Sequence, residues 1–283
     1  MWTVEYGSGN AAVRGLTYFT VDRVFDCGQC FRFEINGSKA VGVAKGKLLE
    51  LTQTDDGIII ENCTEKDFES VWKHYLALDA DYAGINEHFI NGNDAVMSRA
   101  AECSRGIRIL RQDGWEALCS FIISQNNNIP RIKKIIDALC RAYGEPFTVS
   151  GKEYYTFPSA EKLAALSVDD LFALRVGFRA AYISDAAKKV ASGETDLTLI
   201  ESMPTPDALE CLCKIKGVGP KVASCALLFG FDKGDCFPVD VWVKRVLAKY
   251  YPDGFDHTAL GENAGIAQQY LFYYERYEQA GKQ

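Results

Sequence analysis

Residues 212–231 read LCKIKGVGPKVASCALLFGF and are followed at 232–251 by DKGDCFPVDVWVKRVLAKYY. Apolar residues at helical spacing on both sides of Gly217-Val218-Gly219 predict two helices joined by a tight turn. The glycines let the backbone turn sharply and leave consecutive N–H groups pointing outward, where an anion can bind. Pro220 suits the first helical position, since an N–H there has no intrahelical partner. We therefore expect a helix–hairpin–helix segment within Thr205 to Tyr251, with an anion site at the start of its second helix.

Lys221 lies beside the start of that second helix. The positive helix end and apolar neighbours such as Val222, Phe229 and Trp242 would oppose protonation of its amine, and a neutral amine is a nucleophile. The alternative is a lysine that only contacts phosphate. Asp240 follows nineteen residues later in Phe-Pro-Val-Asp. Its carboxylate can cap the helix VWVKRVLAKYY and point back toward the hairpin; taken alone, a cap and nothing more is the favoured interpretation.

The rest of the chain divides into a strand-rich part and a helical part. Between residues 16 and 62, runs of β-branched and aromatic residues alternate with Asn36-Gly37, Lys45-Gly46 and Asp56-Gly57, which predicts an antiparallel sheet with tight hairpins. From Glu65 the apolar spacing is helical to the end. The expected fold class is therefore α+β. We expect a β-rich domain with a flanking helix over residues 1–93 and a helical domain over 94–283, which contains the hairpin (about 205–231) and the Pro-Val-Asp loop (238–240).

Composition narrows the functional classes. No apolar run in the 283 residues reaches the roughly 18 needed to cross a bilayer, and the N-terminus lacks the order of a signal peptide, so we expect an intracellular location, the cytoplasm or nucleoid in a bacterium. The ten cysteines are scattered, and neither Cys27-x-x-Cys30 nor Cys211-x-Cys213 has a matching second pair, so no metal centre is expected. The net charge of −7 counts against nucleic-acid binding, but residues 205–251 hold seven Lys/Arg against five Asp/Glu.

The hairpin and the aspartate together are more specific than either alone. Gly217-Val218-Gly219-x-Lys221, followed by Pro238-Val239-Asp240, resembles the helix–hairpin–helix–Gly/Pro–Asp motif of base-excision DNA glycosylases. The lysine indicates the bifunctional branch, which also has lyase activity, and the additional β domain is similar to that of the 8-oxoguanine DNA glycosylase family. The resemblance covers nearly the whole chain. It implies a monomer acting on double-stranded DNA that contains an oxidised purine, with Lys221 as the nucleophile, Asp240 assisting it, and no cofactor.

The resemblance also assigns a base pocket. The segment CGQCFRF is similar to the family's Gly-Gln-x-Phe-Arg sequence, which implies that the Gly28 carbonyl accepts the N7–H that 8-oxoguanine has and guanine lacks. The segment NAGIAQQYLFYYER implies that Gln268 bonds the pairing edge of the base and that Phe272 stacks on it; four residues apart, the two share a helical face. Cys225 would close the opposite face of the pocket. Without the resemblance, Gly28 is a hairpin glycine, and Phe272 and Cys225 are core.

Four more residues match the part of the family that replaces an extruded base. In SQNNNIPRI, Asn126 resembles the asparagine that fills the vacated space, and Arg131 the arginine that reaches the orphaned cytosine. In VGFRAAY, Phe178 resembles the wedge beside that cytosine, and Arg179 the second arginine that contacts it. The alternatives are a helix stop at the asparagines, and exposed, solvated charges at the two arginines.

One position departs from the eukaryotic members of the family. Trp242 stands where they carry a histidine that contacts a DNA phosphate together with the hairpin residues Gly217, Val218 and Gly219. An indole donates one N–H but carries no charge, which puts that contact in doubt. Glu275 matches the acidic neighbour of the histidine and is left without a histidine to orient.

Two other functions fit the same motif. A monofunctional alkyl-base glycosylase uses the aspartate with water as the nucleophile, and Lys221 argues against it. A noncatalytic DNA-binding or scaffolding module would use the hairpin only to grip phosphates. Such a module would leave the matched residues Gly28, Gln268 and Phe272 without a purpose.

Overall fold

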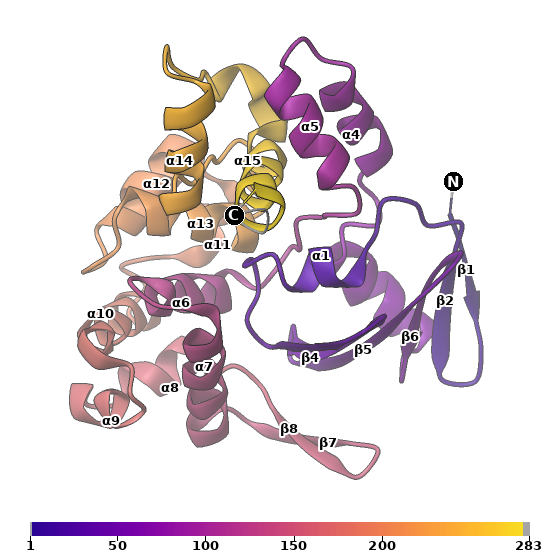
Figure 1. Cartoon of the computed structure of the whole chain (residues 1–283). Helices are drawn as coiled ribbons and strands as arrows, with labels where there is room; N and C mark the ends of the chain where they lie inside the picture. Colours follow the sequence, from indigo (N-terminus) through magenta and orange to yellow (C-terminus); the bar gives the residue numbers. More distant parts are fainter. Residues whose placement is uncertain (1, 280–283) are drawn as a thin grey trace.

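The computed structural model describes residues 2–279, with side chains to residue 277, and places an N-terminal sheet beside a larger group of helices (Figure 1). The sheet is antiparallel, with the strand order β1-β2-β6-β5-β4-β3. Its strands are β1 (Thr3–Tyr6), β2 (Asn10–Arg14), β3 (Phe33–Asn36), β4 (Lys39–Ala44), β5 (Lys47–Thr54) and β6 (Gly57–Glu61). The predicted α+β fold class is confirmed.

Tight hairpins join β3, β4, β5 and β6 where the three glycine dipeptides predicted them. At the β4–β5 turn, both Lys45 (φ 51°) and Gly46 (φ 72°) are left-handed, as the twist of a two-residue hairpin requires. Residues 16–20, at the start of the predicted strand-rich region, form no strand: their main chain bonds to distant loops, with Leu16 N–H donating to Asp56 O and Thr20 N–H to Gly106 O. Strands β1 and β2 were not predicted, although Trp2, Val4 and Tyr6 alternate with polar residues; β1 is a short and largely exposed edge strand.

Helices occupy most of the chain from residue 65 onward, as predicted. The helices are α1 (Val21–Phe25), α2 (Glu65–Asp67), α3 (Lys73–Tyr75), α4 (Tyr82–Ile90), α5 (Ala95–Cys103), α6 (Gly114–Ser124), α7 (Ile129–Tyr143), α8 (Ala160–Ala164), α9 (Val168–Ala173), α10 (Ala180–Ala191), α11 (Leu197–Ser202), α12 (Thr205–Cys213), α13 (Pro220–Gly230), α14 (Val241–Tyr250) and α15 (Ala264–Tyr273). Shorter helical turns are η1 (Phe68–Trp72), η2 (Gly177–Arg179), η3 (Thr258–Asn263) and η4 (Tyr274–Gln279).

One hairpin interrupts this helical part, contrary to the prediction. Strands β7 (Pro146–Val149) and β8 (Lys152–Tyr155) pair in antiparallel fashion beyond α7. The signal in the sequence is Ser150-Gly151, which forms the turn with both residues left-handed (φ 51° and 76°).

The side chains form two hydrophobic cores. The smaller core lies under the sheet and draws on residues between Ala11 and Leu78, with Leu110 added. The larger core begins with Phe31 and Ala77, takes in Tyr82 and Phe89 of α4, and continues through α15. The cores therefore separate near residues 78–82; the domain boundary at residue 93 stays a prediction.

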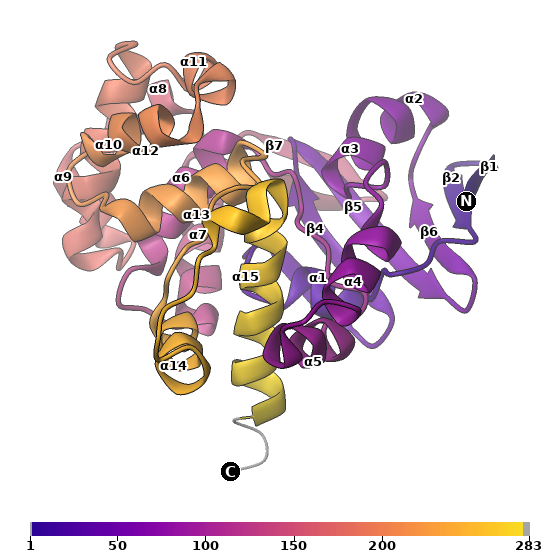
Figure 2. The same cartoon turned by 90° about the horizontal axis from the view of Figure 1, so that it is seen from above.

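Two long helices run through the helical part. Helix α13 packs against α6, and α15 passes between α5 and α14 toward the C-terminus (Figure 2). Helices α13 and α14 both begin in the hairpin segment, so α13, α14 and α15 carry the predicted catalytic and base-pocket residues except Gly28. No helix among residues 2–279 is both long and apolar enough to cross a membrane.

Candidate active site

The predicted helix–hairpin–helix is present, with α12 and α13 joined by the glycine turn. Gly217 is left-handed (φ 76°), and a Cβ there would lie 2.3 Å from the Tyr182 ring, so the turn requires glycine for both its conformation and its packing. The expectation of consecutive outward N–H groups is wrong at Val218, whose N–H donates to Ile215 O within the turn at 3.0 Å. Gly219 is the N-cap of α13, and Pro220 is its first residue as predicted.

Lys221, Cys225 and Asp240 meet at the start of α13 and α14. The Lys221 amine and the Asp240 carboxylate both act electrostatically on the Cys225 thiol, which lies one turn after Lys221 on α13. Burial raises the pKa of Cys225, and the Lys221 amine opposes that rise. The structure thus brings the predicted nucleophile, its acidic partner and one wall of the base pocket together.

The surroundings of Lys221 differ from those expected. Its side chain is exposed in the protein without DNA, so the predicted desolvation by Val222, Phe229 and Trp242 is wrong there. The Lys221 amine lies over the ring of Phe121 on α6, with the Nζ 5.7 Å from the ring centroid. No sequence pattern identified Phe121, because a phenylalanine inside an apolar helix reads as core.

Asp240 caps α14 as predicted. Its Oδ1 accepts the N–H groups of Trp242 at 2.9 Å and Val243 at 2.8 Å. These two bonds fix the carboxylate at the helix end and stabilise its negative charge. The cap and the proposed catalytic role are therefore compatible, since the cap holds the carboxylate near Cys225.

A loop between α1 and β3 brings Gly28 to the same region. Gly28 is left-handed (φ 83°), and a Cβ there would lie 3.7 Å from Cζ of Phe272. Gln29 fixes this loop: its buried Nε2 donates to Val24 O and to Arg108 O, both at 2.7 Å, and its Oε1 accepts Leu110 N–H at 2.8 Å. The hydrogen bonds described among residues 2–277 leave the Gly28 carbonyl without a donor. Gln29 is a positioning residue that the sequence analysis did not identify.

Helix α15 supplies the rest of the predicted base pocket. Gln268 and Phe272 are both buried, with 3% and 7% of their surface exposed. The Gln268 Oε1 accepts from Gln269 Nε2 at 3.0 Å, and the Arg276 guanidinium lies 5.4 Å from the Phe272 ring centroid. A flipped base would therefore have to displace the groups that now cover these side chains.

The three asparagines after α6 have separate tasks. Asn127 donates to Ile123 O at 3.0 Å, and Asn128 caps α7 by accepting Arg131 N–H at 3.0 Å. Asn126 is exposed, with a left-handed backbone (φ 47°). The helix-stop reading thus holds for Asn127 and Asn128, whereas the side chain of Asn126 is presented to the solvent.

The two arginines predicted to contact the opposite base lie in different environments. Arg131 is exposed, and its Nη2 lies 3.4 Å from Arg175 O. The expectation of an exposed Arg179 is wrong: only 2% of its surface is exposed. Its guanidinium donates to the carbonyls of Gln125, Asn126 and Val176, which leaves one of its five N–H groups, on Nη1, without a described acceptor. Arg179 thereby ties η2 to the loop that carries Asn126.

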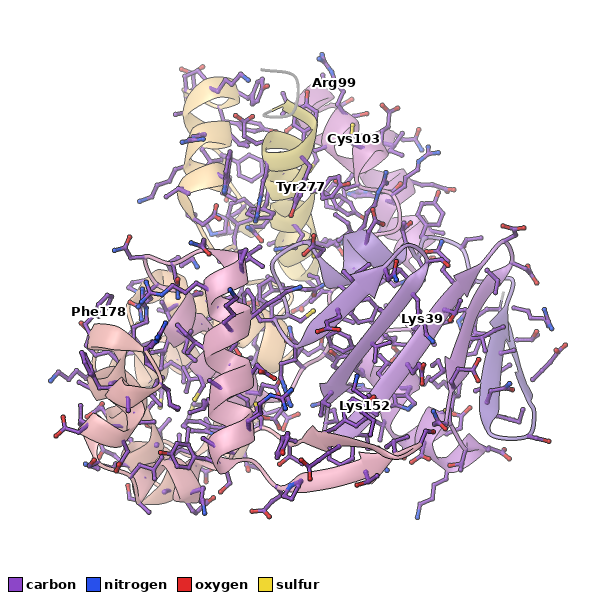
Figure 3. All side chains as sticks on the ribbon, turned by 60° about the horizontal axis from the view of Figure 1, so that its bottom comes forward. Lys39, Arg99, Cys103, Lys152, Phe178 and Tyr277 are labelled. Carbon is purple, nitrogen blue, oxygen red and sulfur yellow. The ribbon has the colours of Figure 1, made fainter. Side chains whose placement is uncertain are left out.

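Phe178 projects from η2 at the molecular surface (Figure 3), with 52% of its surface exposed. Its ring contacts Tyr182 edge-on at 5.7 Å and lies 4.4 Å from the Arg179 guanidinium. Tyr182 also packs against Gly217, so this ring connects the predicted wedge to the glycine turn. An exposed phenylalanine between these supports is a suitable wedge.

Trp242 and Glu275 each have a different charged partner. The Arg245 guanidinium lies 4.6 Å from the Trp242 ring centroid. Glu275 is paired instead with Lys249, at 3.8 Å, and 13% of its side chain is exposed. Glu275 is therefore an ion-pair partner of Lys249 on α14.

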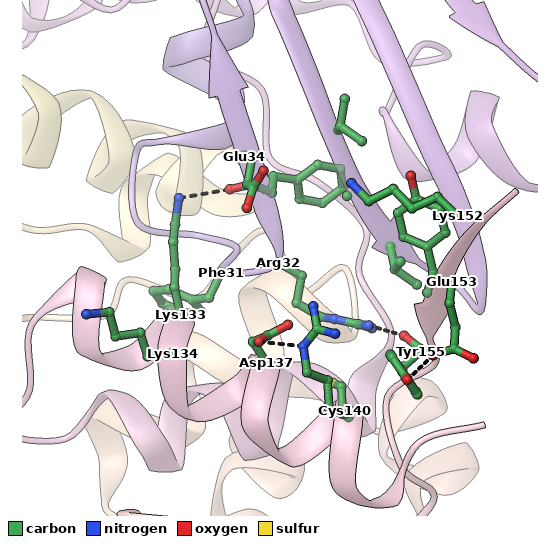
Figure 4. Close-up of a pocket in the computed structure, with 16 residues that line it drawn as sticks. Phe31, Arg32, Glu34, Lys133, Lys134, Asp137, Cys140, Lys152, Glu153 and Tyr155 are labelled. Carbon is green, nitrogen blue, oxygen red and sulfur yellow. Dashed lines mark hydrogen bonds and ion pairs between the residues drawn. The ribbon is translucent and has the colours of Figure 1, made fainter. Parts of the chain in front are cut away.

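A cavity of about 320 Å³ lies away from these residues, between β3–β4, α7 and the β7–β8 hairpin (Figure 4). Charged side chains line much of it, among them Arg32, Lys133 and Asp137. Several of these charges already have partners: Arg32 pairs with Glu116 at 3.2 Å, and Asp137 with Arg141 at 2.9 Å. None of the predicted site residues lines this cavity.

Comparison with known proteins agrees with this arrangement. Residues 14–118 match the family model of the 8-oxoguanine DNA glycosylase N-terminal domain, and residues 119–259 match that of the HhH-GPD superfamily of base excision DNA repair proteins. A probable N-glycosylase/DNA lyase of Methanothermobacter thermautotrophicus is 34% identical over 68% of this chain and 70% of its own length.

Two solved structures are similar over nearly their whole length. One is MBOgg1 in complex with a low-affinity DNA ligand, with 40% identity, a TM-score of 0.93 and 99% coverage of both chains. The other is the Clostridium acetobutylicum 8-oxoguanine glycosylase/lyase bound to double-stranded DNA with cytosine opposite 8-oxoG, with 37% identity, a TM-score of 0.92 and 98% coverage of both. The chain therefore belongs to the 8-oxoguanine DNA glycosylase family of the HhH-GPD superfamily, and it is a DNA N-glycosylase with lyase activity.

Proposed function

We propose that this protein excises 8-oxoguanine from duplex DNA, preferably opposite cytosine, and cuts the strand through a Schiff base on Lys221. The observation that carries the proposal is the meeting of Lys221, Asp240 and Cys225, with Gly28 close to the Phe272 ring. The two similar structures, one of an 8-oxoguanine glycosylase/lyase on DNA, support the choice of lesion.

The reaction begins when DNA is bent and the damaged nucleotide is extruded. The Lys221 Nζ bonds to C1′ of the sugar while the bond from C1′ to the base breaks. Asp240 stabilises the positive charge that develops on the sugar and helps to position the lysine. Loss of the base and opening of the sugar ring give a Schiff base between C1′ and Nζ. Removal of a proton from C2′ then expels the 3′ phosphate, which cuts the strand by β-elimination.

Base selection rests on the pocket of Gly28, Gln268, Cys225 and Phe272. The Gly28 carbonyl accepts the N7–H of 8-oxoguanine, Gln268 bonds the pairing edge, and the base lies between Cys225 and Phe272. One hydrogen bond contributes only about 1 kcal/mol net, but guanine would leave the carbonyl buried without a donor, which costs more.

Borohydride trapping on an 8-oxoguanine duplex tests the nucleophile. The wild type should form a covalent adduct, and Lys221→Gln should form none, because glutamine provides no amine to reduce. Lys216→Gln is the matched control: Lys216 is an exposed lysine of the same hairpin, and this variant should trap normally. An adduct with Lys221→Gln would overturn the assignment, and base release by the wild type without any adduct would favour a monofunctional glycosylase.

The opposite base is tested by single-turnover kinetics. Arg131, with the remaining N–H of Arg179, suits the O2 and N3 acceptors of cytosine, whereas adenine offers a donor amine there. Excision should therefore be faster opposite cytosine than opposite adenine, and Arg131→Ala should reduce that difference. Equal rates in the wild type would contradict the cytosine-reading roles.

Asn126 would fill the gap left by the extruded base, and Phe178 would support the kinked duplex.

A further inference from the structure

Arg245 is held against an aromatic ring at the edge of the candidate site. Its guanidinium carbon lies 4.6 Å from the Trp242 ring centroid, and the two residues are three apart on α14. Trp242 is half-buried and packs against the larger core, whereas Arg245 is exposed. A stacked guanidinium has lost much of its conformational freedom before any ligand arrives.

The charge of Arg245 is not neutralised by the protein. Helix α14 contains no Asp or Glu, in a chain whose net charge is −7. Lys249, on the same helix, pairs with Glu275, but no carboxylate partner is described for Arg245 among residues 2–277. Several other arginines are paired; Arg141, for example, lies 2.9 Å from Asp137. Arg245 therefore keeps its charge available for an anion.

Arg245 lies on the same helix that Asp240 caps. Arg245 is five residues beyond that cap, about 7.5 Å along the helix axis. Its side chain leans back toward the N-terminus of the helix, as helical side chains do, because its guanidinium reaches the ring of Trp242. The main-chain N–H of Trp242 donates to Asp240 Oδ1 at 2.9 Å. The guanidinium therefore lies in the N-terminal half of α14, the helix that is capped by Asp240.

We propose that Arg245 binds the DNA phosphate that borders the extruded nucleotide, and that Trp242 acts as the platform that fixes its guanidinium. This inference rests on the proposed function, which places the sugar of that nucleotide at Lys221 and Asp240. A planar guanidinium can donate two parallel hydrogen bonds to a phosphate. Trp242 then contributes through stacking, and the missing charge at position 242 is supplied by its neighbour.

Salt-dependent binding separates this role from general charge. The probe is a duplex with a tetrahydrofuran abasic-site analogue opposite cytosine, which the enzyme binds without reaction, measured by fluorescence anisotropy at several KCl concentrations. Arg245→Ala should weaken binding about tenfold and lower the slope of log K against log salt by about 1, the loss of one phosphate contact. Lys244→Ala removes the same charge from an exposed neighbour and should change both values much less.

The platform role is tested by a double-mutant cycle. Trp242→Ala should weaken binding as well, and the double variant should be little weaker than Arg245→Ala alone, because both remove the same contact. Arg245→Lys should recover part of the affinity, since it keeps the charge without the planar stack. Excision by Arg245→Ala should be slowed at low enzyme concentration but restored at saturation.

Equal effects of Arg245→Ala and Lys244→Ala, or additive effects of Trp242→Ala and Arg245→Ala, would overturn this inference. Either result can occur while the wild type still traps on an 8-oxoguanine duplex, in which case the proposed function stands. If the wild type neither traps nor releases the base, the proposed function itself has failed.

Discussion

At the scale of single residues, Gly28 shows how one backbone conformation serves recognition. Its left-handed backbone turns the loop beside Phe272, and the hydrogen bonds of Gln29 hold the loop in that position. The carbonyl that would select the lesion is thus fixed in place before DNA binds, so little ordering is needed when the base arrives.

Gly28→Ala should reduce both stability and excision. An alanine at φ 83° is strained by roughly 1–2 kcal/mol, and its Cβ would meet Phe272 at 3.7 Å, where the base has to stack. We expect a lower free energy of unfolding in urea and a single-turnover rate that falls at least tenfold.

Gly37→Ala is the control for Gly28→Ala. Gly37 is also left-handed (φ 59°), but its Cβ would meet nothing within 4 Å, and it lies in the remote β3–β4 turn. This variant should lose similar stability and keep its excision rate. A Gly28→Ala enzyme that excises 8-oxoguanine normally would remove Gly28 from the site.

At the scale of elements, the site is assembled from helix starts. Helix α13 begins at Pro220 beside the glycine turn, and α14 begins at Asp240, so two helix N-termini lie next to the proposed reaction centre. The N-terminus of α13 carries partial positive charge, which favours the phosphates of DNA, whereas that of α14 is already capped by the Asp240 carboxylate. The glycine turn itself is held from behind by Tyr182 on α10, and Lys216 N–H donates to Asp185 of the same helix at 2.7 Å.

Gly217→Ala and Gly219→Ala should differ in stability, because only Gly217 is packed against another side chain. Alanine at 217 would place Cβ 2.3 Å from the Tyr182 ring at a positive φ, so we expect a loss of more than about 2 kcal/mol and a displaced hairpin. Alanine at 219 meets nothing within 4 Å and should cost under about 1 kcal/mol. Thermal unfolding and anisotropy with the abasic duplex measure both. Equal destabilisation by the two changes would contradict the packing role of Gly217.

At the scale of the whole molecule, one buried cation joins the two cores. Arg108 is 4% exposed, and its guanidinium donates to Tyr18 O, Ala77 O and Thr17 O at 2.8, 2.8 and 3.1 Å. It also lies 4.6 Å from the Tyr82 ring centroid. Arg108 thereby holds together the loops before α1, after α3 and before α6. The Gly28 loop is attached to the last of these loops, because Gln29 donates to the Arg108 carbonyl.

Arg108→Met should lower the free energy of unfolding in urea by about 3 kcal/mol, because three carbonyls, of which that of Ala77 is buried, lose their donor. Arg14→Met, which removes an exposed arginine paired with Glu5, should leave the unfolding midpoint unchanged. Activity at low temperature reports whether the remaining folded protein still aligns the Gly28 loop. A midpoint for Arg108→Met equal to that of the wild type would show that the junction is held by apolar packing alone.

Local features in the sequence were sufficient for much of the fold and for the central motif. The turn signals at Asn36, Lys45 and Asp56, the helical spacing from Glu65, and the cap at Asp240 all act within a few residues. Strand β1 and the β7–β8 hairpin were not predicted from the sequence, because each strand is only four residues long and an alternating pattern over so few residues is a weak signal.

What the sequence by itself determined was a local pattern: the turn at Gly217, the lysine four residues later and the aspartate that caps the next helix. The catalytic roles proposed for Lys221 and Asp240 come from the resemblance of this pattern to the glycosylase motif. Only the tertiary structure decided which groups surround them. Phe121 lies against Lys221, Arg179 is buried in main-chain contacts, and Arg245 is stacked on Trp242. Phe121 and the partners of Arg179 come from distant segments, whereas the three-residue spacing of Trp242 and Arg245 already makes them neighbours on α14. Their burial and charge pairing depend on packing between elements.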